Sequence, residues 1–183
     1  MGLRQYLMAS IMTTTSSGDG ANASDRPSAS KWETIKVITP IAAALIAILA
    51  FAIAFWPQIR PVLYGWIWAC AAGWIAAVAA DLNTTRYFFK RVSLDAFCRN
   101  EMGPLFRYYA RRTGGFKRAA ALSVCSELLL ILVLAFAASL AGFPDPAANA
   151  VAWAGLLFIA YGYVHFHASL CNLHLIIQTR RAR

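Results

Sequence analysis

The segment that divides this chain is DLNTTRYFFKRVSLDAFCRNEMGPLFRYYARRTGGFKR, residues 81–118. It carries nine of the seventeen Lys and Arg residues, whereas the sequence on either side is strongly apolar. Each side holds two apolar runs of about 20 residues, the length of helix that crosses a hydrocarbon core of about 30 Å. The pattern predicts an all-α membrane protein with four transmembrane helices, arranged as two antiparallel hairpins joined by this basic segment.

The composition supports a membrane protein and argues against other classes. Hydrophobic residues make up 60% of the chain and charged residues 14%, against about 25% charged in soluble domains. The net charge of +9 comes from residues that flank the apolar runs, where they act as topology signals, so we expect no nucleic-acid partner. The cysteines form no C-x-x-C pair and predict neither a disulfide framework nor a zinc ribbon.

The predicted boundaries follow the apolar runs. Residues 1–34 are rich in Ser, Thr and Gly without an apolar period, which predicts a disordered cytoplasmic tail. Two prolines predict a turn at 57–61. The remaining segments are a four-helix transmembrane domain at 35–177, with helices at about 35–56, 61–81, 119–143 and 148–177 and a cytoplasmic loop at 82–118, and a basic tail at 178–183.

The distribution of Lys and Arg predicts the orientation. Four lie in the N-terminal part through Lys36, one at Arg60, nine in the central segment, none near Pro144 and three at the C-terminus. Cytoplasmic loops of membrane proteins carry an excess of Lys and Arg. We therefore expect a multi-pass protein of the cell membrane with both termini and the central loop in the cytoplasm.

A row of small residues predicts close helix packing along the second apolar run. Small side chains four residues apart let another backbone approach closely, which indicates a homo- or hetero-oligomer. The row drifts around the helix by about 40° per step, so its continuation at Asp81 and Thr85 is predicted to face protein. The row consists of Gly65, Ala69, Gly73 and Ala77.

Within the basic segment, residues 104–112 predict a short amphipathic helix that begins at Pro104 and stops at Gly114. Such a helix lies at a membrane surface beside anionic lipid head groups; the alternative is that it only caps the bundle. The predicted lipid-surface contacts are Arg107, Arg111, Arg112, Lys117 and Arg118.

Ionisable residues inside the apolar runs are the candidate functional residues. Glu127 lies about two turns into the third run, and its depth matches that of His167 in the fourth, at roughly 12 to 15 Å from the inner boundary. On the fourth helix, one face carries a His-Cys-His set, while His165 and Asn172 lie on nearly the opposite side. The predicted polar cluster is Asp81, Thr85, Glu101, Glu127, His167 and His174.

Two interpretations of this cluster remain open. One is a metal or proton site, with His167, Cys171 and His174 as the candidate metal ligands, although no metal or other cofactor is assigned. The other is that Glu127 only satisfies hydrogen bonds between helices. No catalytic spacing such as H-E-x-x-H or G-x-S-x-G is present, so the sequence does not decide whether the chain is an enzyme.

The pattern Asp81-x-x-x-Thr85, then Glu101-x-x-Pro104, then Asn172 resembles an uncharacterised family of small prokaryotic four-helix integral membrane proteins. That family carries Glu-x-Asn-Pro where this chain has Gly103 in the Asn position. The resemblance implies a polytopic membrane protein with a polar cluster at one face, and it implies no activity.

Taken together, these features favour an accessory, packing or interaction subunit in the lipid bilayer. The alternative is a membrane-embedded enzyme or an ion or proton carrier that uses the cytoplasmic-side Asp, Glu and His residues.

Overall fold

The computed structural model describes residues 31–100, 103–140 and 145–181, and within these ranges the chain forms helices and short connections without a strand. The predicted tails fall largely outside these ranges; residues 31–34 and 178–181 are helical. The helices are α2 (Lys31–Ala54), α3 (Trp56–Gly65), α4 (Ile67–Phe89), α5 (Leu94–Asn100), α6 (Pro104–Thr113), α7 (Phe116–Ser139) and α8 (Pro146–Arg181).

Three of these helices, α4, α7 and α8, are long and apolar enough to cross a membrane. Large apolar side chains cover their outer surfaces, for example Trp68, Leu129 and Phe136, which are 83%, 63% and 62% exposed. Contiguous apolar surface of this kind is avoided in soluble monomers, and lipid covers it in a membrane. The described ranges are therefore all-helical with three candidate membrane-spanning helices, which supports a multi-pass membrane protein.

The first half of the chain differs from the prediction. The predicted turn at 57–61 is helical, because these residues lie within α3. The axis of α3 is bent by 104° relative to residues 41–54 of α2, so the first half does not form a simple hairpin. Pro57 lies in the first turn of α3, where a missing N–H costs little. The pair α2 and α3 would be a fourth span only if the bent pair crosses the membrane as one unit.

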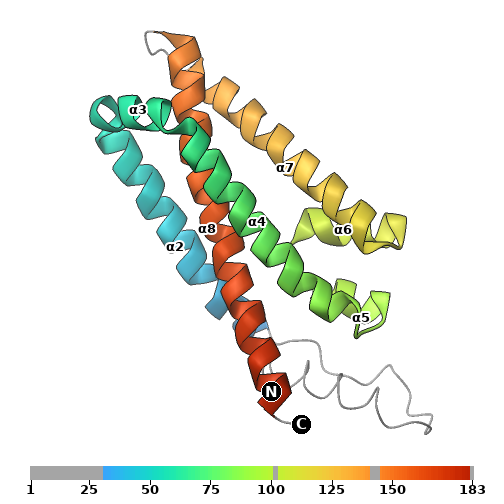
Figure 1. Cartoon of the computed structure of the whole chain (residues 1–183). Coiled ribbons are helices and arrows are strands. Elements are labelled where there is room, and N and C mark those ends of the chain that lie inside the picture. Colours follow the sequence, from blue (N-terminus) through green and yellow to red (C-terminus); the bar gives the residue numbers. More distant parts are fainter. Residues whose placement is uncertain (1–30, 101–102, 141–144, 182–183) are drawn as a thin grey trace, which may run out of the picture.

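Helix α8 lies at the centre of the molecule, with α2 on one side and α7 on the other (Figure 1). It packs most extensively against α4 and also against α7 and α3, whereas α2 packs on α3 and α8 rather than along α4. At 36 residues, α8 is ~54 Å long, which exceeds the thickness of the hydrocarbon core. Its length lets one helix organise the whole fold.

The second predicted helix, 61–81, is displaced toward the C-terminus. Helix α4 begins at Ile67, after the break at Trp66, and continues to Phe89. The prediction ended it at Asp81 because the apolar run ends there. No Gly or Pro interrupts residues 82–89, and Thr85 and Phe88 are buried, so packing extends the helix by two turns beyond Asp81.

The basic segment is folded rather than a simple loop. Helix α6 occupies the segment expected to form a short helix, and Gly114 closes it in the left-handed conformation (φ 63°), which glycine adopts without a steric penalty. Buried aromatic side chains hold α4, α5, α6 and α7 together at this end, including Phe88, Phe97 and Phe106. Helix α7 then begins at Phe116, three residues before the predicted position.

Candidate functional site

Helix α4 presents two polar residues, Asp81 and Thr85, within an otherwise apolar stripe that faces α8. Trp74, Val78, Thr85 and Phe88 are buried, and Asp81 lies on the same stripe because the spacing alternates between three and four residues. The stripe is separate from the row of small residues. At Gly65, the last residue of α3, and at Gly73 of α4, an added Cβ would find no atom within 4 Å, so neither glycine packs against another described part of this chain.

Helix α7 contributes Glu127, which is 7% exposed. The buried positions Glu127, Ile131 and Ala135 follow one another at four-residue intervals, so the carboxylate lies on the face that packs against α8. Burial of a carboxylate requires donors that satisfy its oxygens.

Helix α8 contributes His165 and Asn172, seven residues apart and therefore on one face. Gly162 lies three residues before His165, on the same side of α8. It is so close to α4 that an added Cβ would be 3.4 Å from the Trp74 Cα. The close approach at Gly162 brings the side chain of His165, one turn further along, between α4 and α7.

His165 bridges two carboxylates from two other helices. Its Nδ1 lies 2.8 Å from Asp81 Oδ2, and its Nε2 lies 2.9 Å from Glu127 Oε2 and 3.0 Å from Oε1. Asp81, His165 and Glu127 are named here the carboxylate–histidine cluster. It joins α4, α7 and α8, the three described helices that are long and apolar enough to cross a membrane.

Neutral donors complete the cluster on both sides. The Trp74 indole Nε1 donates to Glu127 Oε1 at 2.8 Å. The Asn172 amide and the Thr85 hydroxyl each donate to Asp81 Oδ1 at 3.3 Å. Within the described residues, no Lys or Arg forms an ion pair with either carboxylate, so His165 is the only cationic partner available to both there.

The two contacts of His165 set a proton requirement. A neutral imidazole has one N–H, so it can donate to only one of the two carboxylates. For both contacts to be hydrogen bonds, a second proton must reside on His165 or on one carboxyl group. The three groups then carry a net charge of −1; without that proton they carry −2, and a nitrogen lone pair faces a carboxylate.

The structure brings together three of the predicted cluster residues, Asp81, Thr85 and Glu127. It does not bring His167 or His174 to them: the prediction chose the wrong face of α8. His167 Nε2 lies 3.6 Å from Cys171 Sγ on the exposed side, and His174 contacts Gln178 of its own helix. Glu101 lies outside the described residues.

The predicted metal ligands do not form a site with further donors. In the described ranges no group of three or more His, Cys, Asp or Glu side chains is arranged to hold a metal ion. The cluster residues Asp81, His165 and Glu127 direct their polar atoms at one another at hydrogen-bond distances.

Sequence reasoning missed His165 and left Asn172 out of the predicted cluster, although the family-like pattern includes Asn172, because it favoured the face of α8 that carries the His-Cys-His set. A different signal marks the buried face. Gly155, Gly162 and Ser169 recur every seven residues, and small residues at such intervals indicate close helix packing. His165 and Asn172 follow Gly162 and Ser169 by three residues and therefore share that face.

Comparisons with protein-family models, curated proteins and solved structures find no match for this chain.

Proposed function

We propose that this chain is a multi-pass integral membrane protein that binds and releases a proton at the carboxylate–histidine cluster, and so belongs to the ion- and proton-carrier class. The observation that carries the proposal is the placement of His165 between Asp81 and Glu127, with a contact of 2.8–3.0 Å on each ring nitrogen. A purely structural lock between helices needs one donor and one acceptor. Two acidic groups on one imidazole form a site whose bonding depends on a mobile proton.

The proton would be coupled to helix packing. With two protons shared in the cluster, α8 is hydrogen-bonded to α4 through Asp81 and to α7 through Glu127. Loss of one proton breaks one of these connections, because a lone pair then opposes a carboxylate. Release of the proton would therefore loosen α8 from one neighbour, which is the kind of two-state change that a carrier requires.

The orientation belongs to the same proposal. The starts of α2 and α7 and the ends of α4 and α8 lie at one end of the molecule in Figure 1, and this end carries most of the Lys and Arg residues. By the positive-inside rule this end faces the cytoplasm, with the bilayer and its anionic lipids as the immediate partners. Asp81 and His165 are about one-fifth exposed, which leaves the cluster an opening for exchange of its proton.

Infrared titration of the purified chain in lipid bilayers tests the proposal. We expect a carboxyl band that changes with pH and that is lost in both Asp81→Asn and Glu127→Gln. His167→Ala, a histidine on the opposite face of α8, is the matched control and should leave the band unchanged. A wild-type spectrum without such a band would contradict proton binding and would leave the cluster a structural lock.

An accessory or interaction subunit is the second candidate, and one observation favours it. A groove of about 700 Å³ runs along the outer surface of α4 and α8, and Ala69, Gly73 and Ala77 line it. Because this wall is built from small residues, a helix of another subunit would fit against it. The oligomeric state of the purified chain tests this candidate, and a monomer unaffected by Gly73→Leu would argue against it.

A further inference from the structure

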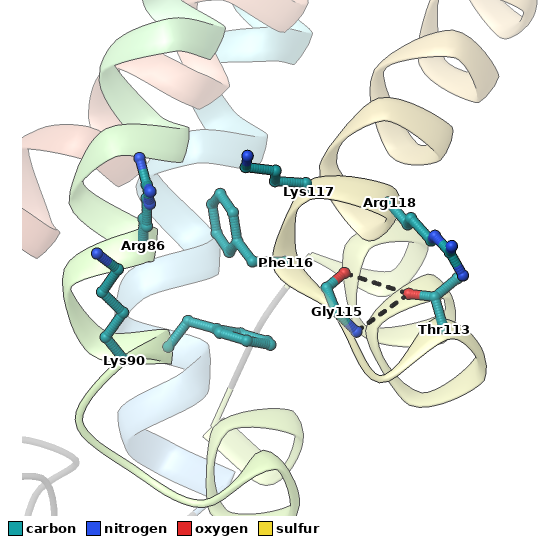
Figure 2. Close-up of a pocket in the computed structure, with 8 residues that line it drawn as sticks. Arg86, Lys90, Thr113, Gly115, Phe116, Lys117 and Arg118 are labelled. Carbon is teal, nitrogen blue, oxygen red and sulfur yellow. Dashed lines mark hydrogen bonds between the residues drawn. The ribbon is translucent and has the colours of Figure 1, made fainter.

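A second cavity lies apart from the carboxylate–histidine cluster, where α4 ends and α7 begins. Its volume is about 490 Å³, and four of its eight lining residues are cationic while none is acidic. The cationic residues are Arg86, Lys90, Lys117 and Arg118. Figure 2 shows Arg86 and Lys90 on α4 and Lys117 reaching toward them from α7, whereas Arg118 extends away from α4.

These cations are available to a ligand. Among the described residues, no carboxylate forms an ion pair with any of the four. Neighbouring arginines outside the cavity are occupied instead: the Arg91 guanidinium lies 3.5 Å from the centroid of the Tyr87 ring, and Arg112 donates to the Tyr108 hydroxyl at 3.1 Å. A concave group of cations without a counter-charge attracts anions.

The first turn of α7 adds a second indication. No side chain caps this end of the helix, and its first turn holds Lys117 and Arg118 without an acidic residue. The N-terminus of a helix carries positive partial charge and unpaired N–H groups, so acidic residues are favoured there and cations are not. A bound anion would accept from these N–H groups and relieve the repulsion.

The lining residues and the position of the cavity indicate which kind of anion would bind there. Phe89 and Phe116 line it, with ring centroids 5.4 Å apart, and these two residues are the last of α4 and the first of α7. The cavity therefore lies level with the ends of two membrane spans, where the head groups of lipids are found. Several cations around one centre suit a group with several anionic oxygens, such as phosphate.

We propose that this cavity binds a phosphate group, supplied either by the head group of an anionic phospholipid or by a soluble phosphate compound. Lys90 and Lys117 hold the phosphate oxygens from opposite walls, and Arg86 adds a third cation. The proposal is independent of proton binding at the carboxylate–histidine cluster.

This site differs from the lipid contacts predicted from the sequence. Those were Arg107, Arg111 and Arg112 of a surface helix, together with Lys117 and Arg118. The cavity shares Lys117 and Arg118 with that prediction, adds Arg86 and Lys90 of α4, and excludes the three arginines of α6. Arg111 and Arg112 are exposed on α6 at the same end of the molecule. They provide a control that removes the same charge without touching the cavity.

The experiment measures dissociation constants for the full-length chain in a neutral detergent. The probes are dioctanoyl phosphatidic acid, dioctanoyl phosphatidylcholine and inorganic phosphate. The variants are Lys90→Gln with Lys117→Gln and, as the control, Arg111→Gln with Arg112→Gln. Because each charge-assisted contact contributes more than a neutral one, we expect the Lys pair to weaken binding of phosphatidic acid by about tenfold or more, and the Arg pair by less than about twofold.

Two outcomes support the site and separate the sources: tighter binding of phosphatidic acid than of inorganic phosphate assigns it to a lipid, and equal binding assigns it to a soluble phosphate compound. Equal loss in the two double variants would overturn the proposal, because it would indicate a diffuse basic surface. Equal affinity for phosphatidylcholine, or no saturable binding of phosphatidic acid or phosphate by the wild type, would also overturn it. Lys90 and Lys117 are exposed, so thermal unfolding should be unchanged, and the single variant Lys90→Gln replaces the pair if it is not.

Discussion

Replacing Glu127 by Ala removes the acceptor for two donors on two other helices. The Trp74 indole donates to it at 2.8 Å, and His165 Nε2 lies 2.9 Å away. Hydrogen bonds between membrane helices contribute about 0.6 kcal/mol on average and up to about 1.7. Two of them together give about 1 to 3 kcal/mol, and we expect Glu127→Ala to lower the free energy of unfolding by that amount.

Glu127→Gln separates the hydrogen bonds from the charge. The amide oxygen of Gln still accepts from Trp74, and its amide nitrogen can donate to a neutral His165. The amide N–H thus replaces the second proton that this contact needs in the wild type. We expect Gln to cost less than about 1 kcal/mol, since both contacts to Trp74 and His165 are kept. The wild type should lose stability as the pH rises and the second proton leaves, whereas the Gln variant should not.

The assay is reversible unfolding by sodium dodecyl sulfate in mixed micelles, followed by the fluorescence of the six tryptophans. Cys125→Ala is the matched control, because Cys125 is exposed on the same helix two residues away, and it should change stability by less than about 0.5 kcal/mol. An Ala variant as stable as this control, or a Gln variant as unstable as the Ala variant, would refute the reasoning.

Three further predictions follow from the same geometry. His165→Ala should destabilise the chain by about 1 to 3 kcal/mol in that unfolding assay, while His167→Ala on the opposite face stays within about 0.5 kcal/mol; equal effects would mean that the two faces of α8 are not distinguished. Gly162→Leu should lower the free energy of unfolding by about 1 to 3 kcal/mol, because the larger side chain overpacks against Trp74. Gly73→Leu places its side chain in open space and should leave the free energy of unfolding nearly unchanged. In a cysteine-free background, a membrane-impermeant maleimide applied to intact cells should label Asp145→Cys and not Ser93→Cys, two exposed positions at opposite ends of the spans; the reverse pattern would invert the orientation.

The two faces of α8 show what a local sequence pattern can predict and what it cannot. Helical geometry alone places His167, Cys171 and His174 on one face and His165 and Asn172 on the other. Which face is buried depends on where α4 and α7 come to lie, and this is a property of the packed helices. Within the sequence of α8, the seven-residue spacing of Gly155, Gly162 and Ser169 indicates which face is packed.

The basic segment gives a second example. Its charge is evident from the sequence, as is the amphipathic pattern of residues 104–112. The cavity between α4 and α7 is not, because Arg86 and Lys90 precede Lys117 by more than 25 residues and meet it only when the aromatic residues around Phe97 and Phe106 pack. Side chains that are distant along the chain become neighbours only through the tertiary fold.

The sequence by itself determined that this chain is helical and membrane-spanning, because apolar runs of bilayer length have no other stable arrangement in lipid. It also identified Asp81, Thr85 and Glu127 as residues whose burial needs partners. Only the tertiary structure decided which partner they share: the close approach of Gly162 to Trp74 inserts His165, rather than His167, between two carboxylates. Helix ends, bends and cross-helix contacts depend on packing between segments, which periodicity within one segment does not determine.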